Sequence, residues 1–156
     1  MPNTYSQIYV QIVFAVKNRE CFIKESFREE LQKYMSGIIA NKKQKLFAIY
    51  CMPDHTHLLI SLKPTMLIAD LVRDIKANSS SFLKEKKMVR GEFSWQEGYG
   101  VFSYHKSQAK NIVDYILHQP EHHQKLSFKE EYLDFLKEHE IEYDQKYLFE
   151  FYENKQ

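Results

Sequence analysis

The sequence LFAIYCMPDHTHLLISL at positions 46–62 decides the expected fold. Residues 46–52 and 55–62 form two short apolar runs that contain aromatic and β-branched side chains, a composition typical of strands. Pro53 and Asp54 stand between the runs and are turn-forming residues. Because the two runs are so close in the chain, they predict an antiparallel hairpin.

The segments on either side extend this hairpin to a βαββαβ order. Residues 6–16 carry apolar side chains on both faces of a period-two pattern, which predicts a central strand. Residues 26–43 are expected to form a helix that Ser26 opens with a capping box, and residues 66–86 a second helix. Residues 93–104 predict a fourth, irregular strand. The expected class is therefore α+β, a ferredoxin-like or RRM-like antiparallel sheet.

The C-terminal third predicts a helical extension of this core. Ser107 can cap a helix that runs to about Gln119, where Pro120 is expected to stop it. A capping box that begins at Ser127 opens a last helix, which ends near His139. With no repeat or linker in the sequence, we expect one domain over residues 1–156. Residues 1–105 would form the βαββαβ core, and residues 106–156 a tyrosine-bearing helix and a C-terminal helical tail.

Composition narrows the class of protein. Hydrophobic residues make up 44% of the 156-residue chain, enough to build a core, so global disorder is not expected. Two cysteines form no disulfide framework and favour a reducing, cytoplasmic setting. No apolar run approaches the roughly 18–20 residues that cross a bilayer, and no signal peptide is recognisable. We therefore expect a cytoplasmic protein with no membrane partner.

Charge is unevenly distributed along the chain. The net charge is only +1, but residues 1–119 carry 17 Lys and Arg against 11 Asp and Glu, whereas residues 120–156 carry 5 against 10. A basic body of this kind could bind an anionic partner. The alternative interpretation is a solvated acidic helix at the end of an ordinary enzyme.

His55 and His57 are the first candidates for chemistry. Side chains at i and i+2 point to the same face of a strand, so the two imidazoles are expected to project together and could share one metal ion at a surface-facing position. The alternative is a pair of exposed or hydrogen-bonded histidines on an edge strand. Taken alone, the His-x-His pair does not decide between the two interpretations.

Further candidates lie between positions 109 and 123. Tyr115 and Gln119 are one helical turn apart at the edge of an apolar stripe, where they would present a phenol and a carboxamide together. Tyrosine is common at helix edges, so this pair alone is a weak signal. His122 and His123 could ligate a metal or lie in a solvent-exposed loop. Cys-x-x-Cys pairs, a P-loop and a Gly-x-Ser-x-Gly motif are all missing, which argues against a zinc ribbon, an NTPase and an α/β-hydrolase.

Aromatic residues next to glycines form another motif, which lies between positions 93 and 102. Such rings could stack on unpaired bases. We expect Trp95 and Phe102 to belong to the core instead.

Three motifs in order resemble one known family. They are MPDHTHLL at 52–59, WQEGYG at 95–100 and YILHQPEHH at 115–123, and the segment 141–148 also fits. Together they are similar to the single-tyrosine transposases of the insertion-sequence 200/605 group, in the His-hydrophobic-His (HUH) nuclease superfamily. Thr56 stands where that group usually has an aliphatic residue, and His118 where relatives often have asparagine.

The resemblance implies a function for four residues. His55, His57 and Gln119 would be metal ligands for Mg²⁺ or Mn²⁺, and Tyr115 would be the nucleophile. The implied activity is that of a transposase and HUH endonuclease, which cleaves and rejoins single-stranded DNA at hairpin-flanked ends through a 5′-phosphotyrosine. A homodimer that associates with the bacterial nucleoid when active, and that has no small-molecule substrate, is implied as well.

Three alternatives stay open at this point. The chain could be a domesticated nuclease that cuts hairpin repeats of its host. It could be a noncatalytic module that binds single-stranded nucleic acid on the same fold. It could also be a structural zinc protein that uses His55, His57, His122 and His123.

Overall fold

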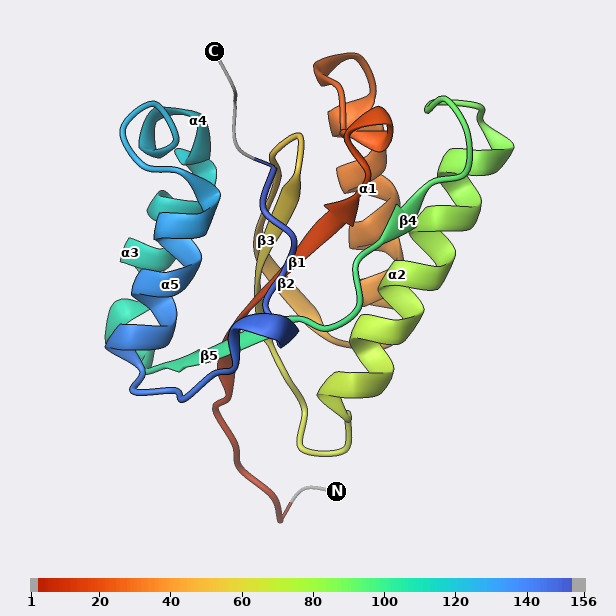
Figure 1. Ribbon diagram of the computed structural model, residues 1–156. Coiled ribbons are helices and arrows are strands. Elements are labelled where there is room, and N and C mark those ends of the chain that lie inside the picture. The colour runs from red at the N-terminus through yellow and green to blue at the C-terminus, as the bar shows by residue number, and fades with distance from the viewer. Residues whose placement is uncertain (1–2, 153–156) are drawn as a thin grey trace.

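The computed structural model describes residues 3–152, and its sheet has the predicted hairpin at one edge. Within residues 3–152, five strands and five α-helices, with two short 3₁₀ segments, follow one another (Figure 1). They are β1 Tyr9–Lys17, η1 Arg19–Cys21, α1 Glu25–Asn41, β2 Lys45–Cys51, β3 His55–Ser61, α2 Ile68–Glu85, β4 Ser94–Trp95, β5 Gly100–Tyr104, α3 Lys106–Leu117, α4 Gln119–His122, α5 Phe128–Glu138 and η2 Gln145–Tyr147.

Strand β1 is central, as its two apolar faces predict. It pairs antiparallel with β3 on one side and with β4 and β5 on the other, and β2 pairs with β3 to form the edge. All residues from Val10 to Val16 are buried. The order β2-β3-β1-β4, with both helices of the core between strands, is the predicted ferredoxin-like arrangement.

Two helical layers cover the two faces of the sheet. Helices α1 and α2 lie on one face, and α3, α4 and α5 lie on the other (Figure 1). Because both faces are covered, six of the seven residues of β3 are buried. The second helical layer comes from the predicted C-terminal extension. Among residues 3–152, no helix is both long enough and apolar enough to span a bilayer.

The segment 93–104 forms two strands rather than one. Trp95 and Phe102 are buried, as predicted, with exposed fractions of 7% and 1%. The loop between β4 and β5 contains Gly98 at a φ of 84°. The Lys76 ammonium of α2 donates hydrogen bonds to the carbonyls of Gln96 and Gly98, at 2.9 and 2.6 Å. These contacts from a distant helix anchor the loop that separates β4 from β5.

The predicted Ser26 cap is wrong. Helix α1 begins at Glu25, one residue before Ser26, and its N-cap is Lys24, which makes no side-chain cap. The N–H of Ile23 donates to the carbonyl of Pro53 at 2.8 Å, and Ile23 is buried. This contact with the hairpin turn fixes the entry of the chain, so the helix starts earlier than the capping motif indicates.

Both predicted limits of the tyrosine-bearing helix also need correction. Its N-cap is His105, not Ser107: the His105 Nδ1 accepts from the Ser107 N–H, and the Gln108 side chain accepts from the His105 N–H. Helix α3 ends at Leu117, and Pro120 lies in the first turn of the following helix α4. Proline fits there because a first-turn N–H has no partner within its own helix.

The last predicted cap is confirmed. The Ser127 hydroxyl accepts from the Glu130 N–H at 3.1 Å, and α5 follows from Phe128 to Glu138. Helix α5 lies against the face of the sheet that carries His55 and His57.

Candidate metal centre and its tyrosine

His55 and His57 project from the same face of β3, as their spacing predicts. The expected surface-facing position is wrong, because the two imidazoles are only 1% and 0% exposed. The edge strand of the alternative interpretation is wrong as well, because β3 lies between β2 and β1. The C-terminal helical layer covers them. The Phe128 ring of α5 stacks on His55 with the ring centroids 3.8 Å apart.

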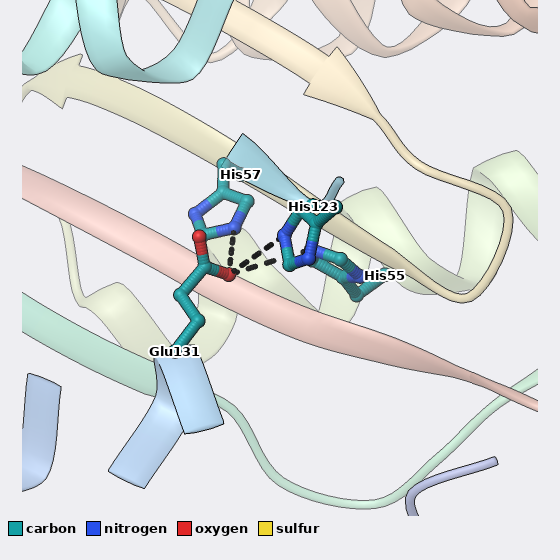
Figure 2. Close-up of side chains that lie close together, drawn as sticks. All are labelled: His55, His57, His123 and Glu131. Atoms are coloured by element: carbon teal, nitrogen blue, oxygen red, sulfur yellow. Dashed lines mark hydrogen bonds and ion pairs between the residues drawn. The ribbon is translucent and has the colours of Figure 1, made fainter. Parts of the chain in front are cut away.

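Two side chains from the C-terminal layer join the pair. His123 comes from the end of α4 and Glu131 from α5, and Figure 2 shows both turned toward the strand histidines. The Glu131 Oε1 lies 2.9 Å from the His57 Nε2, 3.3 Å from the His123 Nε2 and 3.5 Å from the His55 Nε2. One ligand atom from each of the four residues lies within 4.8 Å of the others. This histidine–glutamate cluster could bind a metal ion.

The Nδ1 atom of each imidazole, which points away from Glu131, has a hydrogen-bond partner of its own. The His55 Nδ1 lies 2.7 Å from the Asp54 Oδ1, and the His57 Nδ1 lies 2.9 Å from the Nε2 of Gln11 on β1. The His123 Nδ1 lies 2.8 Å from the carbonyl of Leu126. These contacts orient the rings so that all three Nε2 atoms face Glu131. The oxygen partners of His55 and His123 are of the kind usual around histidines that ligate a metal, whereas the Gln11 amide nitrogen donates to the His57 Nδ1.

Tyr115 and Gln119 lie against the same cluster. The Tyr115 hydroxyl donates to the Glu131 Oε2, and the Gln119 Nε2 donates to the same oxygen at 3.2 Å. The Gln119 Oε1 lies 2.9 Å from the His123 Nε2 and 3.4 Å from the His55 Nε2. The four residues implied by the resemblance therefore meet in one network within a single chain.

His122 and His123 behave differently. Only His123 belongs to the cluster; the His122 ring stacks on Tyr115, with the centroids 4.4 Å apart. A zinc site that uses His55, His57, His122 and His123 together does not match this arrangement.

Burial and neighbouring charges shift the protonation of the site. Burial alone would lower the pKa of His55, but hydrogen bonds to Asp54 and Glu131 outweigh it and raise the pKa to about 9. Burial lowers the pKa of His57. Burial would raise the pKa of Glu131, yet the surrounding imidazoles hold it well below its usual range. The carboxylate is therefore ionised.

The Tyr115 phenol is harder to ionise than a free tyrosine. Burial and the adjacent Glu131 carboxylate both raise its pKa above the usual value. The phenol is therefore protonated in the arrangement described here, and any chemistry at its oxygen requires that a neighbouring group take the proton.

Glu131 is the member of the site that the sequence analysis missed. On α5 the buried residues Phe128, Tyr132, Phe135 and Leu136 form an apolar stripe at helical spacing, and Glu131 lies within it. A carboxylate on a buried helix face must have polar partners there, since an unpaired buried charge is very costly. This interruption of the stripe is the signal that could have identified Glu131.

Known proteins match most of the chain. The family model of IS200-like transposases matches residues 4–119. The ISDra2 transposase TnpA of Deinococcus radiodurans is 25% identical over 115 residues, which are 70% of this chain and 82% of that protein. His55, His57, Tyr115 and Gln119 lie within the residues matched by the family model, whereas His123 and Glu131 lie beyond them.

Two solved structures share the fold. A transposase-like protein of D. radiodurans superposes with a TM-score of 0.58 at 23% identity, covering 76% of this chain and 95% of that one. A REP-associated tyrosine transposase bound to a REP hairpin superposes with a TM-score of 0.59 at 16% identity, covering 79% and 73%.

Proposed function

The chain belongs to the IS200-like transposase family, and from this membership we propose that it cleaves and rejoins single-stranded DNA at hairpin-flanked ends. The observation that carries the proposal is the contact of the Tyr115 hydroxyl with the same side-chain network that contains His55, His57 and Gln119. The solved REP-associated relative is bound to a DNA hairpin, which supports a hairpin substrate for this chain.

The proposed ion is Mg²⁺ or Mn²⁺, held by His55, His57 and Gln119. The convergence of imidazole Nε2 atoms and an amide oxygen fits a divalent ion, and His123 is within reach of the same position. Imidazole nitrogen suits Mn²⁺ better than Mg²⁺, which prefers oxygen. When bound, the ion polarises the scissile phosphate and stabilises the charge that develops on it.

Tyr115 is the proposed nucleophile. Its hydroxyl gives its proton to a neighbouring group and its oxygen bonds to the scissile phosphorus. The bond from phosphorus to the 3′ oxygen breaks, and the 3′ oxygen takes up a proton and leaves as a hydroxyl. The product is a 5′-phosphotyrosine, which keeps the energy of the phosphodiester. A second 3′-hydroxyl can therefore reverse the step and join new ends, which hydrolysis would not allow.

The direct test is a covalent adduct. Wild-type protein incubated with single-stranded hairpin DNA and Mg²⁺ or Mn²⁺ should give a protein–DNA band on a denaturing gel, whereas a perfect duplex of the same sequence should not. Binding should also weaken as salt rises, because phosphate contacts release counterions.

No adduct with varied hairpins and either ion would favour the noncatalytic binding module. A domesticated nuclease would give the adduct as well, and the genomic DNA that flanks the gene would separate it from a mobile element.

The proposed assembly is a homodimer in which each subunit has its own site. The family resemblance supports the dimer, and the intrachain contacts of Tyr115 and Gln119 support a site built within one chain. Light scattering at micromolar concentration should give twice the chain mass. Mixing the inactive variants Tyr115→Phe and His57→Ala should then restore no cleavage. A monomer would contradict the dimer, and recovered cleavage would contradict the site within one chain.

A further inference from the structure

We propose that Glu131 is part of the catalytic centre and connects the metal ion to the nucleophile. One of its carboxylate oxygens binds the ion held by His55 and His57, and the other holds the Tyr115 hydroxyl in place. This inference rests on the proposed function, and it makes helix α5 a catalytic element although α5 lies beyond the residues matched by the family model.

The surroundings of the carboxylate support this role. Glu131 is 2% exposed, and within residues 3–152 its polar partners are all members of the site. They are His55, His57, His123, Tyr115 and Gln119. No lysine or arginine of the described chain pairs with it, so its possible cationic partners are the imidazoles of the site itself. A buried carboxylate is costly unless its partners compensate, and here only the site compensates it.

The two oxygens face different parts of the site. Oε1 lies between the three imidazole Nε2 atoms, at 2.9 to 3.5 Å (Figure 2). Oε2 accepts from the Tyr115 hydroxyl and from the Gln119 amide. The carboxylate therefore has one oxygen directed to the position where the imidazoles converge and one directed to the nucleophile. Its rigid plane fixes the distance between them.

An anionic oxygen ligand also fits the proposed ions better. Two imidazoles and an amide are neutral, and imidazole alone is a poor match for Mg²⁺. A carboxylate supplies the oxygen donor and the negative charge that Mg²⁺ and Mn²⁺ favour. Glu131 thus accounts for how a histidine-rich site could hold either ion.

The decisive variant is Glu131→Gln, which keeps the shape of the side chain and removes its charge. Asp134→Asn is the matched control, because Asp134 lies on the same helix, is exposed and loses the same charge. We expect Glu131→Gln to bind Mn²⁺ at least about tenfold more weakly, measured by electron paramagnetic resonance of free Mn²⁺. Cleavage should stay slow even at saturating Mn²⁺, because a neutral amide oxygen holds the Tyr115 hydroxyl more weakly than the carboxylate does. Asp134→Asn should match the wild type in both measurements.

The outcomes separate this inference from the proposed function. A folded Glu131→Gln variant with wild-type Mn²⁺ affinity and wild-type cleavage overturns the inference and leaves the function standing. If the wild type forms no adduct, the function fails, and the Mn²⁺ affinities still test the ligand. If Glu131→Gln does not fold, wild-type protein labelled with ¹³C at its glutamate carboxyls provides the test. Electron–nuclear double resonance should then show ¹³C coupled to bound Mn²⁺, and its absence overturns the inference.

Discussion

Tyr115→Phe should bind hairpin DNA with nearly wild-type affinity and form no covalent adduct. The substitution removes one oxygen and keeps the ring, which stacks on His122 and packs edge-on against His57 and Phe135. Without that oxygen no bond to phosphorus can form. Loss of a covalent nucleophile typically slows an enzyme by about 10⁴-fold or more, so adduct formation on a denaturing gel should fall below detection while binding by fluorescence anisotropy is kept.

Tyr132→Phe is the matched control for this experiment. Tyr132 follows Glu131 on α5 and is 6% exposed, so the variant loses the same oxygen at a more deeply buried position close to the site. It should form the adduct at the wild-type rate, and peptide mapping of the wild-type adduct should find the DNA on Tyr115. An adduct that persists in Tyr115→Phe, or that maps to another of the 11 tyrosines, would disprove the assignment.

Sequence periodicity was sufficient to predict the sheet, because the alternation of apolar side chains along a buried strand is a local pattern. The alternation in β1 and the short apolar runs around Pro53 predicted the central strand and the hairpin, and both are confirmed. The loop that divides the segment 93–104 is anchored by Lys76 of α2, a contact between distant parts of the chain that no local pattern reports.

Helix limits were less predictable because caps compete with tertiary contacts. Ser127 caps α5 as expected, but Ser26 and Ser107 cap nothing. At the start of α3 an imidazole takes the place of the hydroxyl, and at the start of α1 the hydrogen bond between Ile23 and Pro53 decides the entry.

The candidate site was predictable only in part, for a related reason. Strand alternation and family motifs identified His55, His57, Tyr115 and Gln119, and the structure brings the four together, although their catalytic roles remain predictions. Glu131 joins them only because α5 packs over the sheet. The same packing buries the histidines that were expected at the surface.

His57→Ala should abolish cleavage. The substitution should also lower the stability of the protein, because the His57 imidazole is buried. The imidazole is fully buried and contacts both Glu131 and Gln11, so its removal leaves a cavity and takes a hydrogen-bond partner from a buried carboxylate. Loss of a buried partner costs about 1–3 kcal/mol of the free energy of unfolding, which thermal unfolding can measure. Cleavage should fall by more than about 100-fold and should not recover at high Mn²⁺, because the position of the ion is lost with the ring.

Two comparisons test whether His57→Ala loses cleavage because it loses the metal ion. His118→Ala removes an exposed imidazole whose Nδ1 hydrogen-bonds to the Asp114 carbonyl, and this variant should cleave as the wild type does. Chelation of the wild-type protein should stop cleavage while circular dichroism still reports a folded chain, since β1 and both helical layers form a core without the ion. Unfolding on chelation would instead identify a structural metal site. Full cleavage by a folded His57→Ala variant would remove His57 from the proposed ligands.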